Sequence, residues 1–332
     1  MLSEADLETW MLDELAELEW ESVPGATLAP GSGERTTWND IVLHCRLLQS
    51  LRNLNPGVPE AYLQQAITEV ITPKSQSAIA ENERLHAILV HGYNSIEYVD
   101  HDGQMQRPTI RFFSEEPDRN NYVAANQITI RSRDHERRFD IVLYVNGLPL
   151  AIVELKRAGS ATTVENAYNQ LQTYVKEFPM AFRFANIVVA SNDVDARYGT
   201  PFTPFEHFAP WNVDDDGCLA PTETDGGITT KLELLIFGLF NVERFGQLFT
   251  NFTAFDETPG GLVMRIAKPH QYFAVTKAVA STVTAMTGDK RAGVVWHTTG
   301  AGKSMEMEMY TAKIMRHPKM GSPTIIVLND RA

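Results

Sequence analysis

Cysteine is scarce in this sequence, and long apolar runs are missing. Only Cys45 and Cys218 occur among the 332 residues, and they form no CxxC pair. Neither a disulfide framework nor a cysteine-ligated zinc site is therefore indicated, which fits a reducing cytoplasm. No apolar run approaches the roughly 18 residues that a membrane span needs, so no membrane association is expected. The acidic N-terminus also lacks the basic start and apolar core of a signal peptide.

Positive charge is also in short supply. The chain has 29 Lys and Arg residues against 42 Asp and Glu residues, which gives a formal net charge of −13. A broad basic surface for wrapping nucleic acid is therefore absent, although a local basic groove or a partner subunit could still contact it. The hydrophobic content of 43% is typical of a globular protein, with enough chain for one large or two ordinary domains.

Apolar periodicity and capping signals predict alternating helices and strands over most of the chain. Ser3 and Asp6 can cap a first helix, and Thr162 with Glu165 forms a capping box for a later one. Further helices are expected over 38–53, 59–72, 83–93 and 231–250, and strands over 107–113, 122–132 and 185–192.

The segment "DETPGG" (256–261) is the best candidate for a domain boundary. After it the sequence predicts a helix from Lys268, a short strand at 293–296, a Gly-rich loop with a helix, and a final strand at 323–328. This order indicates the start of a parallel sheet. Because the chain stops after the second strand of that sheet, we expect it to be a truncated version of a longer sequence.

The hairpin "FDIVLYVNGLPLAIVELKRAG" (139–159) carries charge inside two apolar strands. Glu154 and Lys156 share a face because they are two residues apart. A two-residue turn at Asn146-Gly147 would place Asp140 opposite Val153 and send Asp140 and Glu154 to opposite faces. A three-residue turn would instead place Asp140 on the same face as Glu154 and Lys156, so a shared site requires an odd-length turn.

With that geometry, two carboxylates converge and repel each other unless a cation lies between them. Oxygen ligands favour Mg²⁺, which can bind a phosphodiester and lower the pKa of a bound water. Lys156 can position the nucleophile or stabilise developing negative charge. The alternative is a salt-bridged trio in which Lys156 neutralises one of the two carboxylates, Asp140 or Glu154.

The segment "GVVWHTTGAGKSMEM" (293–307) has the order strand, Gly-rich loop, helix. Gly300 and Gly302 allow backbone N–H groups to turn toward an anion, Lys303 can reach phosphates, and Ser304 can hold Mg²⁺. The strict phosphate-loop pattern would need glycine at 297, where His297 stands, and a chance Gly-rich loop is the alternative. Upstream, the amide of Gln271 offers a donor and an acceptor that match adenine.

Asp140 followed by Glu154-Leu155-Lys156 resembles the PD-(D/E)xK nuclease signature, although Phe139 stands where that signature has proline. Gln170 and Tyr174 resemble the QxxxY motif of RecB-like nucleases, and Lys268 to Gln271 resembles the Q-motif region of superfamily-two helicases. Together with "NAYNQLQTY" and "WHTTGAGKS", these segments resemble, in order, the N-terminal part of the type I restriction enzyme motor subunit, HsdR.

The resemblance implies an α/β fold: a RecB-like nuclease domain (1–258), then an incomplete RecA-like motor domain (259–332) that ends after motif Ia. It implies double-stranded DNA, Mg²⁺, ATP, and the methyltransferase and specificity subunits (HsdM and HsdS) as cofactors and partners. Without a DExH element, we expect this chain to lack translocation and efficient ATP hydrolysis. An alternative is a non-catalytic module that binds the methyltransferase partners or ATP without cutting.

The implied site residues fall into two groups. The cutting residues would be Asp140, Glu154 and Lys156, supported by Gln170 and Tyr174, with Asp140 and Glu154 on the metal. An acid on the first helix, Glu4 or Glu8, would join them. The nucleotide and its Mg²⁺ would be held by Gln271, Thr299, Gly300, Ala301, Gly302, Lys303 and Ser304. A basic cluster of Arg131, Arg133, Arg137, Arg138 and Arg157 would contact phosphates or simply be solvated.

Overall fold

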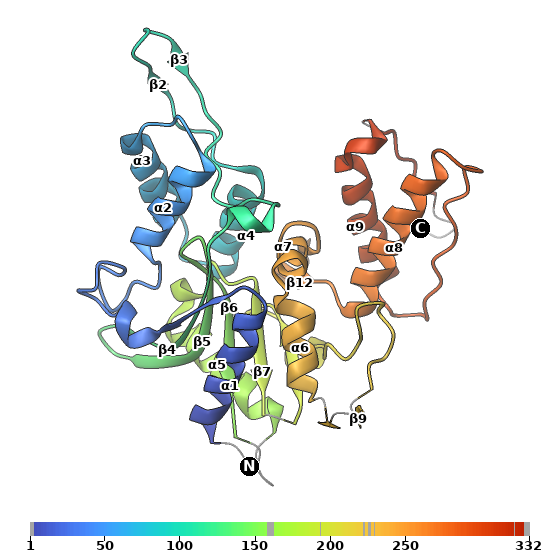
Figure 1. The fold of residues 1–332 in the computed structure, drawn as a ribbon, viewed down its shortest axis with the longest axis horizontal. Helices are drawn as coiled ribbons and strands as arrows, with labels where there is room; N and C mark the ends of the chain where they lie inside the picture. Colours follow the sequence, from blue (N-terminus) through green and yellow to red (C-terminus); the bar gives the residue numbers. More distant parts are fainter. Residues whose placement is uncertain are drawn as a thin grey trace.

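A mixed six-stranded sheet lies at the centre of the protein (Figure 1). The computed structural model describes residues 3–157, 163–192, 194–221, 223–224, 227–228, 230–321 and 323–328. The strand order is β1-β4-β5-β6-β7-β8; β1 runs parallel to β4 and β6 parallel to β7, and the other neighbours are antiparallel. The strands are β1 (Glu21–Pro24), β4 (Tyr122–Arg131), β5 (Glu136–Val145), β6 (Leu148–Leu155), β7 (Ile187–Ser191) and β8 (Ala196–Gly199).

Helices surround this sheet, and three small two-stranded hairpins complete the fold. The helices are α1 (Glu4–Glu17), α2 (His44–Leu54), α3 (Glu60–Ile71), α4 (Ala78–His91), α5 (Val164–Glu177), α6 (Lys231–Phe240), α7 (Val242–Asn251), α8 (Pro269–Ala285) and α9 (Lys303–Arg316). The hairpins are β2 (Tyr98–Val99) with β3 (Met105–Gln106), β9 (Glu223–Thr224) with β10 (Gly227–Ile228), and β11 (Thr253–Thr258) with β12 (Gly261–Ile266). The β2–β3 hairpin projects from the body, whereas the β11–β12 hairpin packs against α4 and α7 (Figure 1). Short 3₁₀ turns span Gly25–Leu28, Pro117–Arg119, Pro179–Ala181, Phe205–His207 and Pro318–Met320. Among the described helices, none has the length and apolar character to cross a membrane.

Two buried clusters cover the two faces of the sheet. One joins Ile141 and Leu143 of β5 to the apolar sides of α1, α6 and α7. The other joins Val142 and Tyr144 to α5. Side chains alternate across a strand, so β5 supplies both clusters and is buried on both sides. The α/β class expected from the sequence, a mixed sheet flanked by helices, is therefore confirmed.

The caps at two helix starts show how local sequence sets the boundaries. Ser3 Oγ accepts from the Asp6 N–H (3.1 Å) and Asp6 Oδ2 accepts from the Ser3 N–H (3.0 Å), so the expected cap of α1 is confirmed. In α5 the side chain of Asn166 accepts from the N–H of Thr163 (2.7 Å). The expected box at Thr162 involves a residue outside the described part of the chain, and the observed cap lies one residue later.

Three expected helices have different limits in the structure. The 38–53 helix begins only at His44, because Asp40 Oδ1 accepts from the N–H of Val42 (3.0 Å) and Leu43 donates to the Gly147 carbonyl (2.9 Å). The 83–93 helix begins earlier, at Ala78. The 231–250 helix is broken at Asn241, whose side chain accepts from the Arg244 N–H and so caps α7.

Three expected strands do not form. In 107–113 only Ile110 makes an isolated bridge, with Tyr93. Residues 293–296 and 323–328 are irregular, with Val294 94% and Leu328 90% exposed. A strand needs the backbone hydrogen bonds of a neighbour, and within the described residues no strand pairs with either segment. The expected boundary segment 256–261 spans the end of β11 and the turn to β12.

Candidate functional site

The hairpin turn between β5 and β6 has two residues. Val145 pairs with Leu148, and Asn146 (φ 53°) and Gly147 (φ 80°) both occupy the left-handed region that such turns require. A Cβ on Gly147 would lie 2.4 Å from the carbonyl oxygen of Leu43. A regular ladder would then put Asp140 and Glu154 on opposite faces of the sheet. The expectation that a shared charged face needs an odd-length turn is nevertheless wrong, because the ladder is not regular.

A β-bulge restores the shared face. The register of β6 shifts at Leu150, so that Leu143 pairs with Ala151. Leu150 and Ala151 are consecutive, yet both pack into the same buried cluster, as expected where one residue is extra. Continuing this register toward the other end of the hairpin puts Asp140 directly opposite Glu154.

The three charged side chains meet at the end of β6. Lys156 Nζ donates to Glu154 Oε1 (2.6 Å) and to the Leu155 carbonyl (3.1 Å). Asp140 Oδ2 accepts from the Leu155 N–H (2.8 Å). Glu154 is fully buried, and its Oε2 accepts no hydrogen bond from the described residues. A buried carboxylate oxygen with no donor is an energetic cost that a further ligand could remove.

Burial and mutual repulsion perturb these groups. Burial, and after it the Asp140 carboxylate, raise the pKa of Glu154 to about 8. Burial also raises the pKa of Asp140. Burial lowers the pKa of Lys156, but Glu154 more than offsets this and the net shift is upward. Two acids, Asp140 and Glu154, therefore share one positively charged neighbour, Lys156. Glu154 is buried, whereas Asp140 and Lys156 are partly exposed.

Helix α5 brings Gln170 and Tyr174 to the same region. The two side chains share a helix face, and the amide of Gln170 donates to the Tyr174 hydroxyl. The Tyr174 ring packs against Phe139, with ring centroids 5.3 Å apart. Burial, and after it the Glu154 carboxylate, raise the pKa of Tyr174 to about 12, so its hydroxyl stays protonated beside the acids.

Helix α1 supplies further acids, and the structure separates the two candidates. Glu8 is 5% exposed and takes hydrogen bonds from Gln127, and the Asp140 carboxylate is among the charges that raise the pKa of Glu8. Glu4 is exposed and accepts from the N–H of Arg157 (3.3 Å). Glu8 is thus the buried one of the two acids. Glu4 is also close, because after burial, the largest cause, its charge contributes to the raised pKa of Asp140. Gln127 carries no sequence signal, because a glutamine within a strand looks like an ordinary solvated position.

The five arginines expected to form a basic cluster divide into two groups. Arg131 pairs with Glu136, and Arg137 pairs with Glu177, each at 2.7 Å. The other three are exposed and form no salt bridge with the described residues: Arg133, Arg138 and Arg157. Only these three have guanidinium groups available for a phosphate.

The Gly-rich loop turns into α9 at Lys303. Gly300 (φ 85°) and Gly302 (φ 88°) both adopt left-handed backbone. Gly302 precedes the first residue of α9, and Lys303 Nζ donates to the carbonyls of His297 (2.9 Å) and Thr298 (3.0 Å). A Cβ at Gly302 would lie 2.3 Å from the end of the Gln271 side chain, which could shift, so it is the left-handed backbone that favours glycine here.

Helix α8 holds this loop through Gln271, which is 4% exposed. Gln271 Oε1 accepts from the Lys268 N–H (2.8 Å), and its Nε2 donates to the Ala301 carbonyl (3.2 Å). Both ends of the amide are thus engaged with the chain, and Gln271 ties α8 to the loop.

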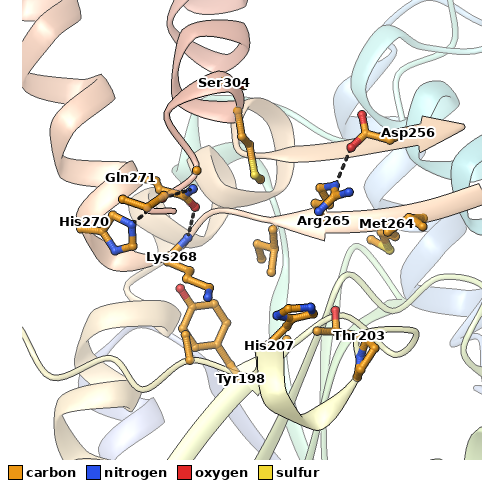
Figure 2. Close-up of a pocket in the computed structure, with 18 of the residues that line it drawn as sticks. Tyr198, Thr203, His207, Asp256, Met264, Arg265, Lys268, His270, Gln271 and Ser304 are labelled. Atoms are coloured by element: carbon orange, nitrogen blue, oxygen red, sulfur yellow. Dashed lines mark hydrogen bonds and ion pairs between the residues drawn. The ribbon is translucent and has the colours of Figure 1, made fainter. Parts of the chain in front are cut away.

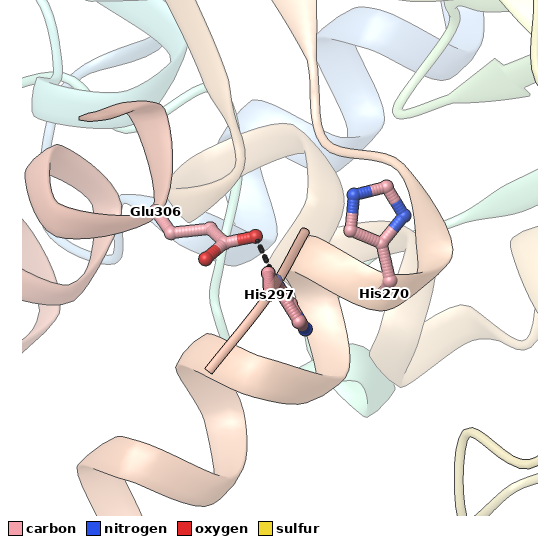
Figure 3. Close-up of side chains that lie close together, drawn as sticks. All are labelled: His270, His297 and Glu306. Atoms are coloured by element: carbon pink, nitrogen blue, oxygen red, sulfur yellow. Dashed lines mark hydrogen bonds and ion pairs between the residues drawn. The ribbon is translucent and has the colours of Figure 1, made fainter. Parts of the chain in front are cut away.

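His297, which stands where the strict pattern has glycine, also has a partner in α9. Its Nδ1 lies 2.7 Å from Glu306 Oε1, and His270 lies close by (Figure 3). The candidate ligand atoms of these three residues lie within 4.8 Å of one another. His270 Nε2 is 3.0 Å from the Ala301 carbonyl, so ordinary hydrogen bonds account for the cluster as a brace of the loop.

A cavity of about 430 Å³ lies beside the loop (Figure 2). Gly300, Gly302, Ser304 and Gln271 line one side, while Tyr198 of β8 and other residues of the sheet body line the other. None of the three charged hairpin residues lines this cavity, so the Gly-rich loop and the charged end of the hairpin are two separate candidate sites.

Known protein families match both parts of the chain. Residues 1–207 match the family described as the type I restriction enzyme R protein N terminus, and residues 270–332 match the SWI2/SNF2 ATPase family. The first match covers the sheet with Asp140, Glu154 and Lys156, and the second covers the Gly-rich loop.

Curated relatives agree with the first match. The type I restriction enzyme HindI endonuclease subunit of Haemophilus influenzae is 33% identical over all of this chain and 32% of its own length. The EcoprrI endonuclease subunit of Escherichia coli is 24% identical over 87% of this chain and 85% of its own length. The chain thus spans about a third of the length of the HindI subunit. On these matches, this chain belongs to the family of type I restriction enzyme R proteins, of which it carries the N-terminal part.

Proposed function

We propose that this chain cuts double-stranded DNA by Mg²⁺-dependent phosphodiester hydrolysis, as part of a type I restriction complex. The proposal rests on one observation: Asp140, Glu154 and Lys156 converge at one point of the sheet, and Glu154 keeps a buried oxygen with no donor. The salt bridge to Lys156 engages only Oε1, and one lysine faces two acids that also contact each other, which favours a further cation over a purely structural trio.

The donor set suits a hard divalent cation. Asp140 and Glu154 would hold Mg²⁺ through carboxylate oxygens, and the free Glu154 Oε2 is the atom that fits best. When bound, Mg²⁺ would supply Lewis-acid stabilisation of the phosphodiester and a more acidic water.

The other side chains act around this centre. The Leu155 N–H fixes one Asp140 oxygen, and Lys156 carries the positive charge that stabilises negative charge developing on the phosphate. Tyr174 stays protonated, so its hydroxyl and the Gln170 amide can donate to the DNA backbone.

A supercoiled-plasmid assay with the methyltransferase and specificity subunits, Mg²⁺ and ATP tests the cutting role. The wild type is expected to nick or linearise the plasmid, and Glu154→Ala to lose at least two orders of magnitude in rate. Glu136→Ala, which removes an exposed acid of the neighbouring strand β5, is the matched control. Equal cutting by the wild type and Glu154→Ala would refute the proposal.

We also propose that the Gly-rich loop binds the phosphates of ATP. The match of residues 270–332 to a family of ATPases and the two left-handed glycines before α9 support this role. Lys303 would exchange its carbonyl partners for phosphate oxygens, and Ser304 would hold Mg²⁺. The N–H groups of the loop residues Thr299, Gly300, Ala301 and Gly302 would surround the phosphates. Gln271 would contact adenine only if its amide left its present partners.

Binding of a fluorescent ATP analogue tests this second role. Lys303→Ala is expected to weaken it by at least tenfold, while Lys290→Ala, an exposed lysine outside the loop, should not. Equal affinity in the wild type and Lys303→Ala would contradict phosphate binding here.

The division into a nuclease domain (1–258) and a motor segment (259–332) is part of the same proposal. We further propose that HsdM and HsdS supply target recognition, that translocation belongs to the intact subunit, and that the protein acts in the cytoplasm, as its two free cysteines suggest.

A further inference from the structure

Gln127 differs from the rest of β4 because its backbone is left-handed. Its φ is +56°, a conformation that costs energy in any residue with a side chain. The ladder continues on both sides: Asn126 pairs with Ile141 and Ile128 pairs with Phe139, so Gln127 lies opposite Asp140. An unfavourable backbone conformation is therefore held directly beside the proposed cutting site.

Both strands change sides at this point. Phe139 packs against α5, whereas Ile141 packs into the cluster on the opposite face. In β4, Ala125 and Ile128 lie in the same cluster although they are three residues apart. Residues two apart normally share a face, so β4 is locally distorted at Gln127. The Gln127 side chain therefore does not follow the regular alternation of the strand.

The Gln127 side chain contacts one residue of α1. Gln127 Nε2 donates to both oxygens of Glu8, at 2.6 and 2.7 Å. Glu8 is 5% exposed, so this amide supplies hydrogen bonds that water cannot easily give. Burial raises the pKa of Glu8, the bond from Gln127 opposes that shift, and Asp140 adds to it.

We propose that Gln127 is a positioning residue that holds the Glu8 carboxylate as a third acid of the divalent-cation site at Asp140 and Glu154. This inference rests on the proposed cutting function. An amide suits the task because it donates hydrogen bonds without bringing a positive charge, which would compete with the cation. The left-handed backbone is the conformation that lets a residue of β4 reach α1.

The first test measures Mn²⁺ binding to the whole chain by electron paramagnetic resonance, without nucleotide or DNA. Gln127→Gly removes the amide but favours the left-handed backbone, so the strand geometry is kept. We expect about tenfold weaker Mn²⁺ binding, as for other residues that orient a metal ligand. Glu19→Gly is the matched control, because Glu19 is exposed and has φ 71° away from the site.

A double-variant comparison separates positioning from general damage. If Gln127 acts through Glu8, Gln127→Gly should weaken Mn²⁺ binding no further in a Glu8→Gln background. Additive losses in the double variant would overturn the proposal.

The strained backbone gives a readout that does not depend on metal. In a Glu8→Ala background the amide has no acid to hold, so Gln127→Gly should raise the thermal unfolding midpoint by about 2 °C. A lowered midpoint would show that Gln127 stabilises the fold by contacts other than its hydrogen bonds to Glu8.

Glu154→Ala distinguishes this inference from the function on which it rests. If Glu154→Ala binds Mn²⁺ like the wild type, the proposed cation site itself fails. If Glu154→Ala loses binding while Gln127→Gly binds within twofold of the wild type, only the role of Gln127 is refuted. The Mg²⁺ concentration for half-maximal plasmid cutting should follow the same order, rising in Gln127→Gly and unchanged in Glu19→Gly.

Discussion

At the scale of single residues, the strongest consequence concerns Glu154. Its pKa of about 8 lies above the ordinary 4.5, so between these values the folded state keeps a proton that the unfolded state has lost. The unfolding free energy should therefore fall as pH rises from about 4.5 to 8, with a slope approaching 1.4 kcal/mol per pH unit.

Urea unfolding in EDTA across this range measures the effect. Glu154→Gln should remove most of the slope, and saturating Mg²⁺ should reduce it in the wild type because the cation favours the ionised carboxylates. A slope that is the same in wild type and Glu154→Gln would contradict the raised pKa.

Gly147 is the second residue whose surroundings allow a specific prediction, here about the free energy of unfolding. Gly147→Ala must place a Cβ in a left-handed turn and 2.4 Å from the Leu43 carbonyl, so it should lower the unfolding free energy by more than about 2 kcal/mol. Gly57→Ala is the control, because Gly57 has φ 89° but no atom within 4 Å of its Cβ position. Equal losses in urea unfolding would show that the close approach to Leu43 does not matter.

At the scale of elements, the bulge in β6 reconciles a two-residue turn with a shared charged face. Deleting Leu150 should give a regular ladder that still pairs Leu143 with Ala151 and keeps Asp140 opposite Glu154. We expect Mn²⁺ binding to persist, with a loss of about 2–4 kcal/mol of stability because Leu150 is buried.

Inserting one alanine after Ile152 is the complementary experiment, because it adds a residue to β6 where the first variant removes one. It would turn Glu154 and Lys156 to the other face of the sheet, so Mn²⁺ binding should be lost while circular dichroism still reports a folded chain. If the deletion abolishes binding and the insertion preserves it, the assigned register is wrong.

At the scale of the whole molecule, this acidic protein has three exposed arginines in or next to the strands that carry its proposed cutting residues. Arg133, Arg138 and Arg157 are exposed and form no salt bridge with the described part of the chain, whereas the net charge of −13 repels DNA elsewhere. Replacing all three by alanine should lower DNA affinity and reduce the slope of log affinity against log salt by about 3.

Fluorescence anisotropy with a short duplex at several salt concentrations measures this slope. Arg131→Ala with Arg137→Ala is the control, since those two arginines are already paired with Glu136 and Glu177. A control that changes the slope as much as the triple variant would show that these three arginines do not act as the DNA contacts.

Some elements follow from local chemistry, and others depend on distant partners. The cap at Ser3 and the two apolar runs joined by Asn146-Gly147 needed only neighbouring residues, so α1 and the hairpin could be predicted. The strands expected at 293–296 and 323–328 did not form, because a strand also needs a partner that sequence alone cannot supply.

The sequence by itself determined the residue types of the site: two acids and a lysine in an apolar hairpin, and glycines before a lysine-led helix. These patterns depend on short-range spacing, which the chain carries in its order of residues. Only the tertiary structure decided that the Asp140 carboxylate reaches the Leu155 N–H beside Glu154, because a one-residue bulge reverses every side chain beyond it. It also decided that Glu8 is the buried acid of α1 and Glu4 an exposed one, since contacts between α1 and β4 depend on backbone angles that no residue pattern records.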